Sequence, residues 1–110
     1  MSLPRLSVFP FVDASQPLRM RAPAVDESGR ALSDFMMIIP GLRKRPELHR
    51  QTVMKDIHRV LSRFDETVVF AELNLALNLL WISIRPVTGI RDEIAQALRT
   101  CIPDARLVSH

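Results

Sequence analysis

A short apolar run and the turn signal behind it mark the first regular element of the chain. Residues 33–39 read SDFMMII, and a Pro-Gly pair follows directly. A continuous apolar run of this length is typical of a buried strand. Proline and glycine in succession suit the two central positions of a type II turn, because the second of these needs a positive φ. The pattern predicts a strand over 33–39 and a tight turn over 39–42.

Two later segments place apolar residues at helical spacing. The first is predicted to start near Pro46, because proline is well tolerated at the first helical position. The second is predicted over 88–101, with Thr88 as its N-cap and Pro103 beyond its end. The predicted inner face of the first helix consists of Leu48, Val53, Ile57, Val60, Leu61 and Phe64. The predicted inner face of the second consists of Ile90, Ile94, Ala97, Leu98 and Cys101.

The stretch between these helices has a mixed pattern. Its ends, TVVF and WISI, have the composition of strands, whereas the middle, AELNLALNLL, favours a helix by propensity. We favour two strands, at 67–74 and 79–85, joined near 76–78. One buried helix over the whole stretch is the alternative. A last short strand is predicted in the sequence ARLVS, residues 105–109.

The order of these elements predicts the fold class. Strand, helix, strand, strand, helix and strand follow one another over residues 33–110, which is the split βαβ plan of the ferredoxin-like fold. We therefore expect one α+β domain, with an antiparallel sheet and two helices on one of its faces. Its 110 residues are enough for one such domain with a modest core.

Residues 1–32 are predicted to form an extended, proline-rich N-terminal arm. They hold four of the eight prolines, which leaves no room for a long helix. DESG, residues 26–29, is typical of a turn, so residues 18–25 could form a hairpin with the first core strand. The arm is expected to lie at a sheet edge of its own domain or to cross to a partner subunit.

From PGLRKRP to ARLV the chain is similar to heavy-metal-associated-type domains of the ferredoxin-like class. The similarity lies in the element order, in the Pro-Gly loop after the first strand, and in the ending IRDEIAQALRTCIPDARLV. Such domains bind soft metals through two cysteines in that loop, since thiolates suit Cu(I) and Zn. Here the loop, residues 41–45, has no cysteine and three basic residues. The resemblance therefore implies a fold and no metal site.

Positive charge is concentrated in residues 41–63. This segment has seven basic and two acidic residues, a net charge of +5, whereas the whole chain carries +3. Free amides and the helix dipole favour an anion at a helix N-terminus, and arginine adds bidentate geometry. The candidate anion-binding residues are Arg43, Lys44, Arg45 and Arg50. The alternative is a solvated helix face, and the absence of interleaved aromatic residues counts against single-strand binding.

Strand alternation predicts a second candidate surface. If Ala71 and Leu73 face the helices, the intervening residues face the other way, and the same holds for the strand at 79–85. The open face is then expected to carry Val68, Phe70, Glu72, Asn74, Leu79, Trp81, Ser83 and Arg85. Phe70, Leu79 and Trp81 are the candidate interface residues. A large apolar patch needs a cover, which the arm, a second subunit or a small ligand could supply.

The remaining candidates favour no chemistry. His49 and His58 are nine residues apart, about half a helical turn out of phase, and Cys101 is expected in the core. The chain offers no nucleophile–base pair, glycine-rich phosphate loop or metal-ligand spacing. We expect neither an enzyme nor a bound cofactor or metal. The single cysteine and the lack of a roughly 20-residue apolar stretch favour a cytoplasmic location without membrane contact.

These patterns lead to one main hypothesis and one alternative. The main hypothesis is a small non-enzymatic interaction or regulatory module. We expect it to be a homodimer that uses its open sheet face or its N-terminal arm, and a further protein partner is compatible with it. The alternative is a protein that binds an anion or nucleic acid through the basic segment 41–63.

Overall fold

The structure is a computed structural model of the 110-residue chain, and it describes residues 5–9 and 29–108. The expected hairpin strand at 18–25 and most of the expected turn at 26–29 lie outside the described residues. The elements are β1 (Arg5–Phe9), β2 (Ser33–Ile38), the 3-10 helix η1 (Leu42–Lys44), α2 (Glu47–Ser62), β3 (Val68–Asn74), β4 (Leu79–Ile84), α3 (Ile90–Cys101) and β5 (Arg106–Leu107).

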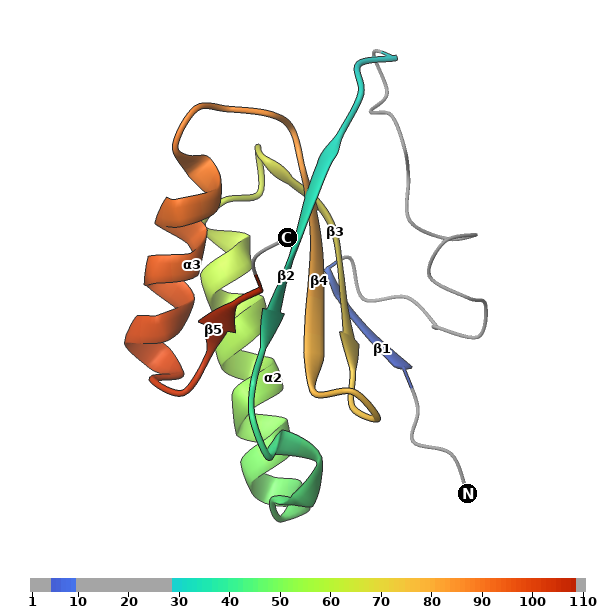
Figure 1. Ribbon diagram of the computed structural model, residues 1–110, viewed down its shortest axis with the longest axis vertical. Coiled ribbons are helices and arrows are strands. Elements are labelled where there is room, and N and C mark those ends of the chain that lie inside the picture. Colours follow the sequence, from blue (N-terminus) through green and yellow to red (C-terminus); the bar gives the residue numbers. More distant parts are fainter. Residues whose placement is uncertain (1–4, 10–28, 109–110) are drawn as a thin grey trace.

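The five described strands form one sheet with the order β1-β3-β4-β2-β5. Every described pair of neighbouring strands is antiparallel. Both helices lie on the same side of this sheet (Figure 1). The chain is therefore an α+β protein with one sheet and one layer of helices. At the edge, β1 pairs with β3, and Arg5 lies opposite Asn74.

The two-strand interpretation of residues 67–85 is confirmed, and the single buried helix is wrong. β3 and β4 form a hairpin whose turn lies at residues 75–78. In this turn the Asn78 N–H donates to the Leu75 carbonyl over 3.3 Å. Asn78 has a positive φ of 54°, a conformation that asparagine tolerates better than most residues. This turn lies inside AELNLALNLL, so the segment forms a hairpin in spite of its helix propensity.

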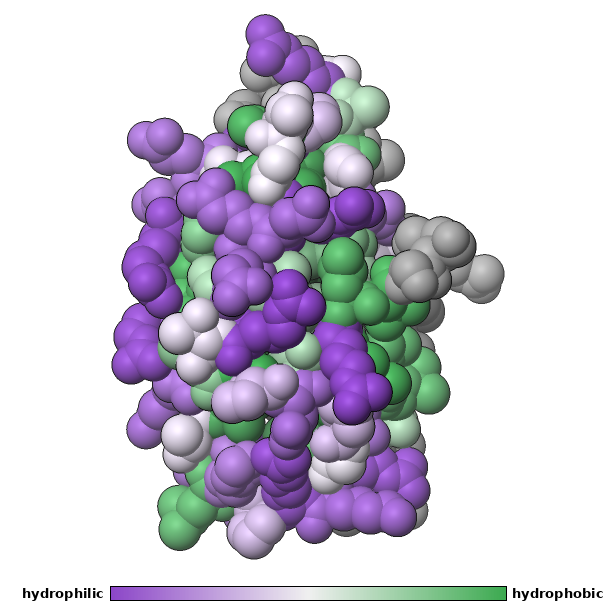
Figure 2. Space-filling model, turned by 60° about the vertical axis from the view of Figure 1, so that its left-hand side comes forward, coloured by the Kyte–Doolittle hydropathy of each residue, from purple (hydrophilic) through white to green (hydrophobic). Residues whose placement is uncertain are grey.

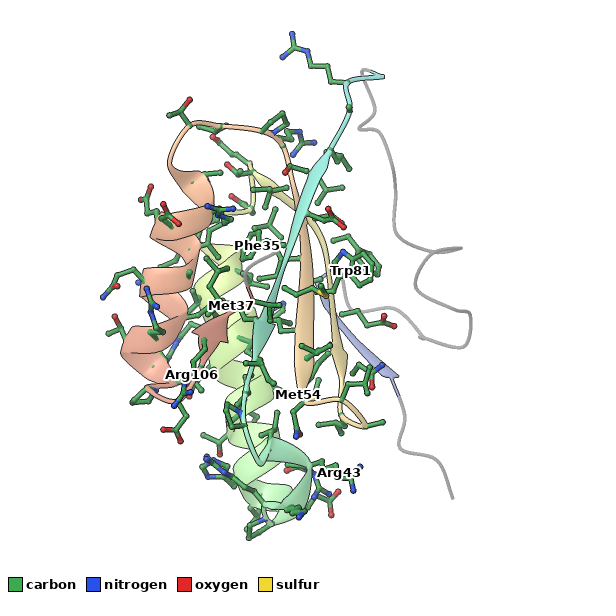
Figure 3. All side chains as sticks on the ribbon, in the orientation of Figure 1. Phe35, Met37, Arg43, Met54, Trp81 and Arg106 are labelled. Carbon is green, nitrogen blue, oxygen red and sulfur yellow. The ribbon has the colours of Figure 1, made fainter. Side chains whose placement is uncertain are left out.

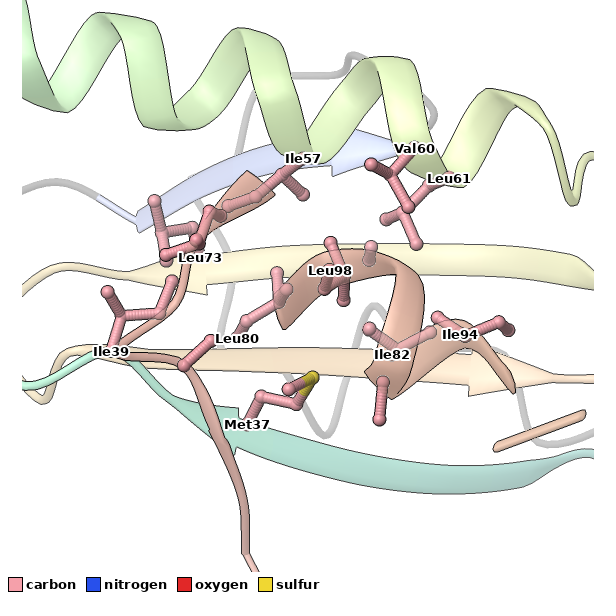
Figure 4. Packing of buried hydrophobic residues seen from close by; sticks show 14 of the residues in the cluster. Met37, Ile39, Ile57, Val60, Leu61, Leu73, Leu80, Ile82, Ile94 and Leu98 are labelled. Carbon is pink, nitrogen blue, oxygen red and sulfur yellow. The ribbon is translucent and has the colours of Figure 1, made fainter. Parts of the chain in front are cut away.

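The core lies between the sheet and the two helices (Figure 4). β2 contributes Phe35 and Met37, and the neighbouring strand β4 contributes Leu80 and Ile82. Opposite them, Ile57 of α2 and Leu98 of α3 are almost completely buried. Full burial of one such side chain contributes about 1.5–3 kcal/mol, so this layer supplies most of the favourable free energy of folding.

One residue assigned to the inner face of α2 was placed wrongly. Leu48 has 78% of its surface exposed, whereas Val53, Ile57, Val60 and Leu61 are buried. Leu48 precedes Ile57 by nine residues, or about 900° of helical rotation, which puts it on the opposite face.

The N-terminus of the last helix also differs from the prediction. α3 begins at Ile90, its N-cap position is Gly89, and no side-chain cap hydrogen bond is made. The preceding turn is closed by the Ile90 N–H, which donates to the Val87 carbonyl over 3.1 Å. Gly89 has a φ of 78°, which suits the third position of this turn. Thr88 therefore lies one residue too early to cap the helix.

The two leucines of α2 provide a test of these assignments. Leu61→Ala should lower the free energy of unfolding by about 2–5 kcal/mol, because it opens a cavity in the core. Leu48→Ala should change it by less than about 0.5 kcal/mol, as is usual at exposed positions. Urea unfolding followed by circular dichroism measures both. Similar losses in the two variants would contradict the orientation of α2.

Candidate functional site

The sheet face turned away from the helices brings the three candidate interface residues together. Because Ala71 and Leu73 belong to the core, the alternate residues of β3 point to the other face. The hairpin register pairs Phe70 with Ser83, Glu72 with Trp81, and Asn74 with Leu79. In Figure 3, Trp81 lies on the opposite side of the sheet from Phe35 and Met37. Phe70, Leu79 and Trp81 thus share this face.

Val68 does not lie on this face, contrary to the prediction. It belongs to the core cluster and pairs with Ile84. The register between Val68 and Phe70 is shifted, so Val69 is the extra residue of a β-bulge. An extra residue reverses the alternation, which explains why Val68 and Ala71 both face the helices.

β2 adds two residues to this surface that were not among the predicted ones. Met36 pairs with Trp81, and Ile38 pairs with Leu79. All four side chains are half-buried. The continuous run SDFMMII gave no alternation that could separate its two faces. The one usable signal is position along the strand. Met36 and Ile38 are two residues apart, and Met36 directly follows Phe35, so both point to the face opposite that of Phe35. We call Met36, Ile38, Leu79 and Trp81 the apolar patch.

Beside the apolar patch, three side chains of the same face are buried. The exposed fractions are 5% for Phe70, 2% for Glu72 and 2% for Ser83. Glu72 makes an interaction within the chain. The Trp81 indole N–H is also buried, and it has no hydrogen-bond acceptor among the described residues. This face therefore combines a partly exposed apolar surface with polar groups removed from water.

The basic loop is the second candidate site, and it starts with the expected turn. The Leu42 N–H donates to the Ile39 carbonyl over 3.2 Å, and Gly41 has a φ of 72°. Both observations agree with the predicted type II turn. Leu42 is completely buried and anchors the start of η1 in the core. Residues 43–45, which carry three of the basic side chains, follow directly after this buried leucine.

The loop is tied to the β3–β4 hairpin through Asn78. The Arg43 N–H donates to the Asn78 Oδ1 over 2.8 Å, and the Ile39 N–H donates to the Asn78 carbonyl over 2.8 Å. The Arg43 guanidinium reaches the same hairpin, where Nη1 donates to the Ala76 carbonyl over 3.3 Å. Side chain and backbone of one asparagine therefore fix the position of the loop. In Figure 3, Arg43 lies at the end of the molecule where α2 begins.

Arg45 and Arg50 have different partners. Arg45 forms an ion pair with Asp104 over 2.9 Å, and its Nη1 lies 2.7 Å from the His49 Nε2. Arg50 Nη1 donates to the Arg45 carbonyl over 2.6 Å and to the Arg43 carbonyl over 3.3 Å. Lys44 is exposed. The structure thus brings the four candidate anion-binding residues into one loop and the first turn of α2, and Asp104 offsets the charge of Arg45.

The cysteine and the two histidines considered in the sequence lie at the following places in the fold. Cys101 is half-buried and packs against the core, with Arg59 Nη2 3.5 Å from its Sγ. His49 is exposed and His58 is half-buried on α2. Within residues 5–9 and 29–108, no group of three or more histidine, cysteine, aspartate or glutamate residues is arranged to hold a metal ion.

Comparisons with known proteins add no relative to this picture. No family model matches the chain, and neither a curated protein nor a solved structure matches it. The resemblance to heavy-metal-associated-type domains therefore stays a prediction. Of the helices that the structure describes, none is long and apolar enough to cross a membrane.

Substitution of Asn78 tests the attachment of the basic loop. Asn78→Ala removes the acceptor of the Arg43 N–H and places alanine at a positive φ. We expect it to lower the free energy of unfolding by about 1–3 kcal/mol. Asn78→Gly removes the acceptor alone and should cost about 0.5–1.5 kcal/mol. Chemical unfolding gives both values, and a glycine variant less stable than the alanine variant would contradict this account.

Proposed function

We propose that this protein is a small non-enzymatic interaction or regulatory module that assembles as a homodimer. The contact is made by the sheet face turned away from the helices or by the N-terminal arm. The observation that carries the proposal is the apolar patch. It consists of two cross-strand pairs, Met36 with Trp81 and Ile38 with Leu79, on a face opposite both described helices.

We further propose that the domain has the ferredoxin-like arrangement. The strand order supports this proposal, because β5, β2, β4 and β3 follow one another in the sheet and are antiparallel throughout. Numbered from the first core strand, this is the order 4-1-3-2 of the split βαβ plan. In this fold one face of the sheet carries the helices, and the other is available for contacts.

Two features favour the sheet face over the arm as the contact. The described part of the arm, β1, pairs with β3 of the same chain, so its backbone groups on that side have partners. The apolar patch instead keeps part of each side chain in contact with water. The outer surface on the side that carries the helices is largely hydrophilic (Figure 2). A second copy of the chain that covered the patch would remove these apolar side chains from water.

Trp81 is the expected centre of the contact. Tryptophan is among the residue types most enriched at positions that dominate interface energies. In the sheet, Trp81 lies between Met36 of β2 and Glu72 of β3. A symmetric dimer would bring the patch of each chain against that of the other. A standard interface needs about 800 Å² from each partner, so neighbouring residues of the same face must contribute too.

Light scattering tests the dimer directly. We expect the native chain to have twice its monomer mass of 12.5 kDa, and we expect Trp81→Ala to shift it toward the monomer. Loss of a central tryptophan costs about 2 kcal/mol, or roughly a thirtyfold increase in Kd. Leu48→Ala is the control, because it removes an even more exposed apolar side chain, which lies on α2 and away from the proposed contact. A native monomer, or a Trp81→Ala variant of unchanged mass, would refute the sheet-face dimer.

A further inference from the structure

We propose that Arg43, Lys44 and Arg50 form a binding site for phosphate groups, separate from the dimer contact. These residues lie in η1 and the first turn of α2, at the end of the molecule where Figure 3 labels Arg43. The partners of these side chains decide whether each positive charge is neutralised or remains available to a ligand.

The two arginines are held by neutral oxygens. Arg43 Nη1 donates to the Ala76 carbonyl, and Arg50 Nη1 donates to the carbonyls of Arg43 and Arg45. A carbonyl orients a guanidinium and leaves its full charge in place. Arg45 differs, because Asp104 offsets its charge over 2.9 Å. We therefore leave Arg45 out of the site and assign it to the attachment of the loop.

The geometry of these contacts leaves donors for a ligand. A guanidinium has five N–H groups on three nitrogens, and the contacts above use only Nη1 of each arginine. The remaining N–H groups can donate to two oxygens of one phosphate. Because carbonyls already restrict both side chains, binding orders them at a smaller entropic cost than it would order free surface arginines.

The surrounding charge favours an anion over a cation or a neutral ligand. Lys44 is exposed and lies between Arg43 and Arg50 in the sequence, and Arg50 lies in the first turn of α2, at the positive end of the helix dipole. Glu47 in the first turn is the acidic residue nearest in sequence. It cannot offset three cations, so the local field remains positive.

Phosphates of a nucleic-acid backbone suit this site better than stacked bases. Residues 41–63 contain no aromatic ring other than those of the histidines, and single-strand binding needs stacking platforms. Contacts to phosphates require only cations in fixed positions and are independent of base sequence. We therefore expect the site to contact the phosphates of a duplex, and a free phosphate compound is the other source of the same group.

Fluorescence anisotropy with a labelled DNA duplex tests the proposal at several salt concentrations. Each phosphate contact adds about −0.9 to the slope of log K against log salt, so the expected slope is about −2.7. Between about 50 and 200 mM salt, the affinity should then fall roughly fortyfold. Lys44→Gln should reduce the slope by about 0.9 without loss of a contact that holds the loop. Arg43→Gln should also reduce the slope by about 0.9, although it removes the contact of Nη1 to the Ala76 carbonyl as well.

Lys55→Gln is the matched control, because it makes the same change of charge about two turns from the start of α2. It should leave the slope unchanged. Equal effects of Lys44→Gln and Lys55→Gln, or no binding at low salt, would overturn the assignment of the site.

Inorganic pyrophosphate is tested separately by NMR. Shifts at residues 43–50 without duplex binding would assign the site to free phosphate compounds and overturn the nucleic-acid expectation.

The Trp81→Ala variant separates this proposal from the dimer. It should bind the duplex through the same loop, since Trp81 lies on the sheet and not on η1 or α2. Loss of duplex binding in this variant, with the fold intact, would show that the binding surface is the sheet face and would contradict the phosphate site.

Discussion

The pairing of β4 with strands on both sides is the constraint on which the rest of the structure depends. β4 pairs with β3 on one side and with β2 on the other, and both pairings are antiparallel. Because side chains alternate with a period of two, a slip of one residue would move Leu80 and Ile82 out of the core. The same slip would carry Trp81 into it. The register of one strand thus decides both the packing against the helices and the composition of the opposite face.

Much of the fold could be predicted from sequence because its signals are local. The inner faces of both helices follow from apolar spacing, and the Pro-Gly turn follows from the φ that glycine allows at position 41. The errors arose where one residue changes the phase of a pattern. Leu48 lies half a turn out of phase with the residues grouped with it, and the bulge at Val69 reverses the alternation before Phe70. Thr88 is a typical N-cap residue, but the turn through Gly89 moves the N-cap position one residue later.

The candidate sites were predictable in part. Alternation within β4 and most of β3 brought Phe70, Leu79 and Trp81 to one face, and the charge count singled out the loop at 43–45. Met36 and Ile38 could not be assigned, because a uniformly apolar strand has no polar residues to mark its faces. The partners of the arginines were also invisible. Asp104 follows Arg45 by 59 residues, and Asn78 follows Arg43 by 35, so only the tertiary fold brings these groups together.

Asn78 accepts hydrogen bonds from both Ile39 and Arg43. It therefore links the local stability of the loop to that of the hairpin. Amide protons exchange with solvent only when their hydrogen bonds open, and segments that open together share one protection factor. The Ile39 and Arg43 amides can exchange only when the loop separates from the hairpin end. Their exchange rates thus report one opening event, in which the turn beside Leu79 and the loop that carries Arg43 part from each other.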